Sequence, residues 1–161
     1  MAYTAKVEGM AELSRKLSKL GEAAIPIAAA SLYEGAGVMA DAVSQAVHGI
    51  ATEPFRYAAE GHQRKPSPEE KALLEAAPKG VAKFRKTSTS VDTSVGLSRS
   101  GYGQLGSKTK PIPQIANAIN SGTSFMKKQP FFRKAVRQNE SKAKAVIESG
   151  MIRRIDEISK D

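Results

Sequence analysis

The chain has 161 residues, a length that fits one domain able to bury a core of its own. It contains no cysteine, which excludes disulfides, thiolate metal ligands and cysteine nucleophiles. Its 25 Lys and Arg residues exceed its 16 Asp and Glu residues, and the formal net charge of +9 makes nucleic acid an obvious candidate partner. Aromatic residues make up only 6% of the chain and Trp is absent, which disfavours a platform for stacking bases.

The apolar residues occur in short runs. No run approaches the roughly 20 residues that a membrane helix needs, so we expect no membrane partner. The N-terminus lacks an apolar stretch, so we expect no secretory signal.

Two amphipathic helices are predicted at the N-terminus. The first has a three- and four-residue apolar spacing and is predicted to end at Gly21. Its apolar positions are Met10, Leu13, Leu17 and Leu20. The second begins at about residue 24, with Pro26 in its first turn, where a missing N–H costs nothing. Its apolar positions are Ile25, Ala28, Leu32, Ala36, Met39, Val43, Ala46 and Ile50.

The second predicted helix contains two glycines, Gly35 and Gly37. Each interior glycine costs roughly 1 kcal/mol relative to alanine, so their presence calls for a reason. One reason is close approach of a neighbouring backbone, and the other is a kink or break in the helix. The sequence alone leaves both open.

Residues 51–80 differ in composition from what precedes them, since four of the eight prolines lie here among charged side chains. We interpret this stretch as an exposed excursion of the domain. Within it, Ser67 is a good N-cap, Pro68 suits the first helical position and Glu70 completes a capping box. A short helix over 68–77 is therefore predicted, stopped by Pro78.

Residues 87–98 alternate between Thr, Val or Leu and small polar residues, a period of two that indicates strand. The alternating stretch and the residues before it are long for one strand, so a hairpin with its turn near Thr87–Ser90 is predicted. Residues 99–111 are rich in Gly and Lys and are predicted to form a loop. Helical spacing then returns through Ile112, Ile115 and Ile119, with Gly122 placed to end that helix.

A long final helix is predicted to begin at Pro130. Its apolar stripe comprises Phe132, Val136, Ala143, Ile147, Met151, Ile155 and Ile158. Its outward positions carry Arg133, Lys134, Arg137, Lys142, Lys144, Arg153 and Arg154. Helices first, a small antiparallel sheet in the middle and a helix last predict an α+β fold, one domain over 1–161.

The sequence contains no convincing motif for catalysis, cofactor binding or metal binding. The stretch GYGQLG, residues 101–106, matches G-x-G-x-x-G, but Pro111 and Pro113 forbid the helix that a dinucleotide site needs. His48 and His62 lack carboxylates at ligand spacing, and no serine has a histidine base in a recognisable elbow. We therefore expect no enzyme, no cofactor and no metal site.

Several pieces together carry a family resemblance: VEGMAELSRKLSKL near the start, VDTSVGLS in the middle, then IANAINSGTSFMKKQPFFRKAV and a basic amphipathic helix. They resemble the tailed-phage family of the gene product ten type, small siphophage neck or minor tail proteins described as tail completion or head–tail joining proteins. The resemblance spans nearly the whole chain. Its sharpest part is a Gly-Thr turn, a short loop, then Gln-Pro-Phe, here Gly122, Thr123, Gln129, Pro130 and Phe131.

Two features depart from the family pattern. Many members carry an aromatic-rich segment with an acidic residue before the Gly-Thr turn, where this chain has Asn120 and Ser121. Many also show Pro-x-x-Thr-Gly after the second helix, which residues 51–80 lack.

The resemblance implies a structural virion protein, assembled in the host cytoplasm, that forms a ring around the DNA channel of the neck or tail. A sixfold ring is the expectation by analogy, and closure requires heterologous contacts between copies. The implied partners are head-closure, tail terminator or tail tube proteins, and DNA that passes through without sequence selection. The alternative, from the charge alone, is a small basic nucleic-acid-binding protein.

The stretch from Gly122 to Phe132 supplies the candidate functional residues. We expect Phe131 and Phe132 to pin the last helix to the fold, Phe132 on the core stripe and Phe131 about 100° away over the sheet edge. The candidate subunit interface is the mixed apolar and basic loop with the outward arginines behind it. Its members are Phe125, Met126, Lys127, Lys128, Arg133 and Arg137.

Overall fold

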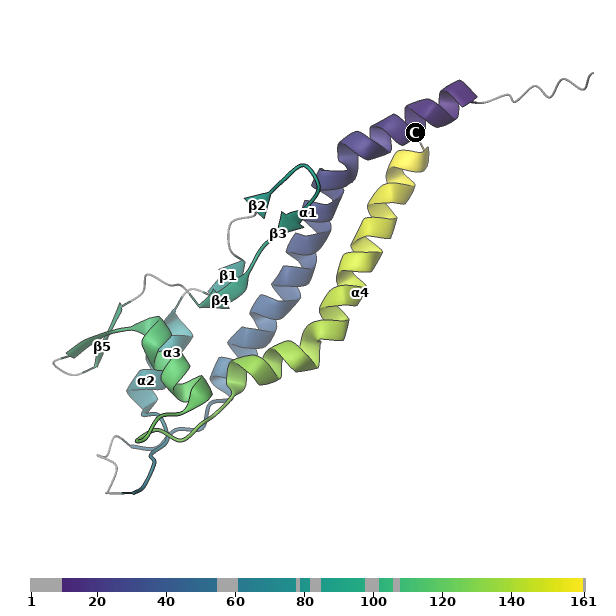
Figure 1. The fold of residues 1–161 in the computed structure, drawn as a ribbon. Helices are drawn as coiled ribbons and strands as arrows, with labels where there is room; N and C mark the ends of the chain where they lie inside the picture. The colour runs from purple at the N-terminus through teal and green to yellow at the C-terminus, as the bar shows by residue number, and fades with distance from the viewer. Residues whose placement is uncertain are drawn as a thin grey trace, which may run out of the picture.

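Two long helices, α1 (Met10–His48) and α4 (Phe131–Lys160), form the frame of the molecule. They run side by side in opposite directions in this computed structural model (Figure 1). The smaller elements lie along α1 and gather at the end where α1 finishes and α4 starts (Figure 1). The structure describes residues 10–54, 61–77, 79–81, 85–97, 102–105 and 108–160.

The small elements are two helices and six short strands. The helices are α2 (Pro68–Ala76) and α3 (Ile112–Ser121). The strands are β1 (Lys79–Val81), β2 (Arg85–Lys86), β3 (Val91–Asp92), β4 (Val95–Leu97), β5 (Tyr102–Leu105) and β6 (Lys108–Pro111). They pair antiparallel as β1–β4, β2–β3 and β5–β6. The expected mixture of helices with antiparallel strands is confirmed, but the described strands form three separate two-stranded sheets in place of the one small sheet that was predicted.

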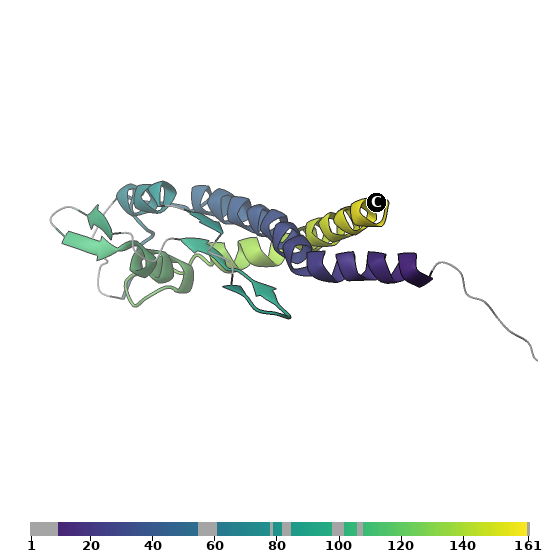
Figure 2. The same cartoon turned by 90° about the horizontal axis from the view of Figure 1, so that it is seen from above.

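The prediction of two N-terminal helices is wrong, because α1 continues through Gly21 and Pro26. An interior proline costs about 3 kcal/mol through its missing N–H and ring clash, so other contacts must favour the continuous helix. One of them is the Lys16 ammonium, which donates to the carbonyl oxygen of Ser159 on α4 at 3.1 Å. The axis of α1 bends between its purple first portion and its blue remainder, as an internal proline explains (Figure 2).

The two glycines of α1 have different surroundings. A Cβ at Gly35 would overlap the side chain of Ile147 and lie 3.1 Å from the Ala143 carbonyl oxygen on α4. A Cβ at Gly37 would meet nothing within 4 Å. Close approach of a neighbouring backbone therefore explains Gly35, whereas nothing in the structure explains Gly37.

By length and hydropathy, the portion Ser14–His48 of α1 could also cross a membrane, since it contains an 18-residue window with a mean hydropathy of 1.3. In the fold, α1 packs against α4, β1 and β4. Glu34 within this portion pairs with Arg154 of α4 at 2.6 Å. The core helix of a folded domain can meet the same hydropathy test, so the test alone is weak evidence for a membrane span. The expectation of no membrane partner stays a prediction.

The main core lies where the end of α1, both short helices and the start of α4 meet. Val47, Leu74 and Ile119 are fully buried there. Leu74 belongs to the stretch 51–80, as do the buried Arg64 and Glu70. The interpretation of that stretch as an exposed excursion is therefore wrong for residues 64–77, while 55–60 and 78 lie outside the described residues.

Two local predictions are confirmed and one is wrong. The Ser67–Glu70 capping box starts α2, and the Thr87–Ser90 turn joins β2 to β3, with the Thr87 amide donating to the Ser90 carbonyl at 2.9 Å. The loop predicted over 99–111 instead contains the β5–β6 hairpin. The hairpin packs closely on α2 at Gly103, where a Cβ would lie only 2.5 Å from Leu73 Cδ1. A dinucleotide site is unsupported, since Tyr102–Leu105 is a strand followed by another strand.

Candidate subunit interface

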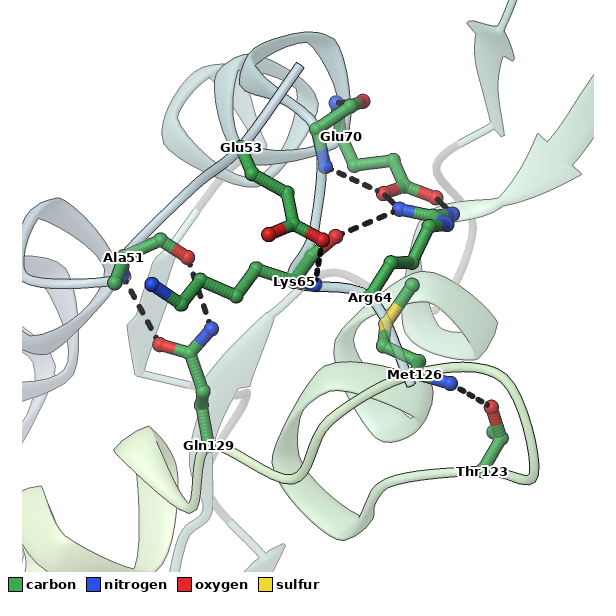
Figure 3. Close-up of polar contacts among 9 residues, drawn as sticks. Ala51, Glu53, Arg64, Lys65, Glu70, Thr123, Met126 and Gln129 are labelled. Atoms are coloured by element: carbon green, nitrogen blue, oxygen red, sulfur yellow. Dashed lines mark hydrogen bonds and ion pairs between the residues drawn. The ribbon is translucent and has the colours of Figure 1, made fainter. Parts of the chain in front are cut away.

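The loop between α3 and α4 begins with a tight turn that fixes its backbone. Gly122 ends α3 with a φ of 79°, a left-handed conformation that favours glycine. The Thr123 amide donates to the Met126 carbonyl, and the Met126 amide donates to Thr123 Oγ1, both at 3.0 Å. The turn expected from the Gly-Thr pair is therefore a closed hydrogen-bonded loop (Figure 3).

Gln129 joins this loop to the end of α1. Its side chain makes two hydrogen bonds with the backbone of Ala51, accepting from the amide at 3.0 Å and donating to the carbonyl at 2.9 Å (Figure 3). The backbone amide of Gln129 donates to the Ile119 carbonyl at 2.8 Å. One glutamine thus ties the start of α4 to α1 and α3, and Pro130 follows directly before α4 begins.

The middle of the loop pairs with the segment before α2. Met126 and Arg64 form a parallel β-bridge, in which the Arg64 amide donates to Phe125 O at 2.9 Å and the Lys127 amide donates to Arg64 O at 2.8 Å. The Met126 side chain is only 2% exposed and belongs to the main core. The prediction that Met126 contributes to an exposed interface is therefore wrong.

A buried ion pair lies beneath this bridge. The Arg64 guanidinium makes two hydrogen bonds of 2.7 Å to the carboxylate of Glu70, and Glu70 also accepts from the Ser67 amide at 2.8 Å (Figure 3). Burial acts to raise the pKa of the Glu70 carboxyl, but these two hydrogen-bond donors outweigh it and hold the pKa below its ordinary value. Sequence reasoning found Ser67 and Glu70 through the capping box but missed Arg64, whose pairing depends on the fold of the polar segment around it.

Both phenylalanines pack at the start of α4, as expected, but Phe131, predicted to lie over the sheet edge, is the more buried of the two. Phe131 is 7% exposed and lies in the main core. Phe132 is half-buried and packs against both the main core and a second cluster formed by Ala42, Val43 and Ala135. The helix therefore turns the Phe131 side into the core at its start, which a single stripe drawn along the whole helix did not anticipate.

The remaining predicted interface residues are exposed. They are Phe125, at 49% exposure, and the cations Lys127, Lys128, Arg133 and Arg137. Lys134 is exposed beside them. None of these cations pairs with a carboxylate of the described residues. A rigid loop and the first turns of α4 therefore present positive charge to solvent.

His48 meets a carboxylate that lies 27 positions away in the sequence. Its Nδ1 lies 2.9 Å from Glu75 Oε1 at the exposed end of α1. Among the described residues no three His, Asp or Glu side chains gather as metal ligands do. His62 is exposed and lies elsewhere, before the Arg64 bridge.

No protein-family model, curated protein or solved structure matches the chain.

Proposed function

We propose that the chain is a structural protein of a phage neck or tail, a ring subunit that acts in tail completion or head–tail joining. The observation that carries the proposal is the behaviour of the Gly-Thr to Gln-Pro-Phe stretch. Gly122, Thr123 and Gln129 fix the backbone through the turn and its hydrogen bonds, while Lys127 and Lys128 between them carry exposed positive charge without an ion pair among the described residues. A loop with a fixed backbone and exposed charged side chains suits a protein whose task is to meet neighbouring subunits.

The mass of the assembled species tests the ring. We expect purified protein to form one closed species of defined copy number, measured by native mass spectrometry and light scattering. A protein that stays monomeric at every accessible concentration would contradict the ring. The neighbouring genes test the phage role, since portal, head-closure and tail tube genes beside this one are the expected arrangement.

A small basic nucleic-acid-binding protein is the second candidate. It is favoured by five exposed cations that form no ion pair among the described residues, namely Lys127, Lys128, Arg133, Lys134 and Arg137. A dedicated DNA binder loses affinity steeply with salt, because each phosphate contact releases counterions. A ring through which DNA passes gains little from strong phosphate contacts. We therefore expect weak DNA binding without sequence selection, and tight selective binding at physiological salt would favour this second candidate instead.

A further inference from the structure

An open groove lies between the last turns of α1 and the first turns of α4. Apolar side chains line it, among them Ala46 of α1 and the largely buried Ile50 and Phe131. Lys128 and Lys134 also line it, and no Asp or Glu of the described residues does. The groove therefore offers apolar contact and positive charge together.

A stripe with the opposite charge lies near the end of α4. Glu148, Ile152, Ile155 and Asp156 have spacings of four, three and one, which place them on one side of the helix. Ile152 and Ile155 are 61% and 37% exposed. The other side of the same turns packs on α1, where Gly150 meets Ser31 and Arg154 pairs with Glu34. We name these four residues the tip stripe.

The groove and the tip stripe cannot meet within one copy. The part of α4 that lines the groove extends only to Asn139, whereas the tip stripe begins at Glu148, nearer the other end of the helix. The rise of an α-helix, about 1.5 Å per residue, puts Lys134 and Ile152 on the order of 27 Å apart along the axis. Contact between them therefore requires two copies, each with one groove and one tip stripe. Such a head-to-tail contact closes into a ring when the rotation permits.

We propose that the groove beside Lys128 and Lys134 receives the tip stripe of a second copy of this chain. The inference rests on the proposed ring and names the surfaces that would build it. Isoleucines separated by three positions are suitable anchors for an amphipathic helix in an apolar groove. Glu148 and Asp156 then face the groove lysines, so the contact is complementary in both apolarity and charge.

Charge reversal tests the contact with a matched control. Lys134→Glu introduces a carboxylate in the groove, whereas Lys142→Glu makes the same charge change at an exposed position of α4 outside the groove lining and outside the candidate interface. We expect Lys134→Glu to weaken association about tenfold, or about 1.4 kcal/mol. Lys142→Glu should change it less than about threefold, or about 0.7 kcal/mol. Association is measured by sedimentation equilibrium, with helix content checked by circular dichroism.

The reciprocal change supplies the rescue. Asp156→Lys alone should also weaken association about tenfold, and the double variant Lys134→Glu with Asp156→Lys should recover most of the loss. A 1:1 mixture of Lys134→Glu and Ile152→Asp should stop at two copies, since only one groove and one tip stripe remain compatible. Larger species in that mixture would contradict a head-to-tail contact.

The outcomes separate the inference from the function on which it rests. If the wild type forms rings and every variant forms them equally well, the groove contact is wrong but the ring proposal still holds. Wild-type protein that never associates would overturn both. If Lys134→Glu leaves association unchanged but lowers affinity for duplex DNA more than Lys142→Glu does, the groove binds phosphate and the inference is wrong.

Discussion

The two ends of the molecule are built differently. At one end, which we call the body, the ends of α1 and α4 enclose α2, α3 and the 122–130 loop around fully buried Leu74 and Ile119. At the other end, the arm, the middle of α1 packs closely against α4 through small residues at Gly35 and Gly150. The arm leaves four large apolar side chains exposed, namely Leu17, Tyr33, Ile152 and Ile155.

The comparison indicates that the two ends serve different purposes, one for stability and one for association. The body has a dense core with a satisfied polar network, because its buried ion pair and its loop bonds are complete within one chain. The arm is held by one line of close packing and the Glu34 ion pairs. We therefore expect the body to determine stability and the outer face of the arm to serve association.

The largest expected effect is truncation of a body aromatic. Phe131→Ala should lower the free energy of unfolding by about 3–5 kcal/mol, because it removes a core side chain and leaves a cavity. Phe132→Ala should cost less, since Phe132 is only half-buried. Urea titration followed by circular dichroism measures both. A larger loss for Phe132→Ala would contradict the observed packing.

Removal of the buried cation comes next. Arg64→Met should cost about 3–5 kcal/mol, because it leaves the Glu70 carboxylate buried without its partner. Changing both residues, Arg64→Met with Glu70→Leu, should recover much of that loss, since no buried charge then remains. Thermal unfolding of the single and double variants makes the comparison. Equal destabilisation of the two proteins would mean that the unpaired charge is not the cause.

In the arm, two glycines form a matched pair. Gly35→Ala should destabilise the protein by about 1–3 kcal/mol, because the new methyl group overlaps Ile147. Gly37→Ala, two residues away and unobstructed, should stabilise it by up to about 1 kcal/mol through helix propensity. Chemical denaturation measures both changes. A stabilising Gly35→Ala would show that α1 and α4 pack less closely than described.

The smallest effect is the pH dependence due to Glu70. Its pKa in the folded chain lies below the ordinary value of 4.5, so its stabilising contribution is fully present above pH 4.5. That contribution is lost as the pH falls through the lowered pKa. Wild type and Glu70→Gln should therefore differ most in unfolding free energy near neutral pH and converge in acid. A difference that grows in acid would contradict the pairing with Arg64.

Local signals in the sequence predicted local features well. The capping box at Ser67, the turn at Thr87–Ser90 and the end of α3 at Gly122 each depend on residues a few positions apart. Long-range pairs were not predictable, because Gln129 and Ala51 are 78 positions apart and no short pattern joins them. Gly21 and Pro26 suggested a helix end that contacts along α4 override.

The candidate site was predicted only in part, because it also depends on long-range contacts. Lys127 and Lys128 were correctly expected to be exposed, but Met126 between Phe125 and Lys127 points into the core. Met126 is buried where its backbone pairs with Arg64 in a β-bridge, and no pattern in the sequence predicts this bridge. The groove likewise depends on how the end of α1 meets the start of α4.

The most direct test of the proposed function is the native mass of the purified full chain, measured across a concentration series at physiological salt with and without duplex DNA. The account predicts a closed ring of fixed copy number without DNA, and only weak, salt-sensitive DNA binding. A monomer at every concentration that binds duplex DNA tightly and selectively would contradict it.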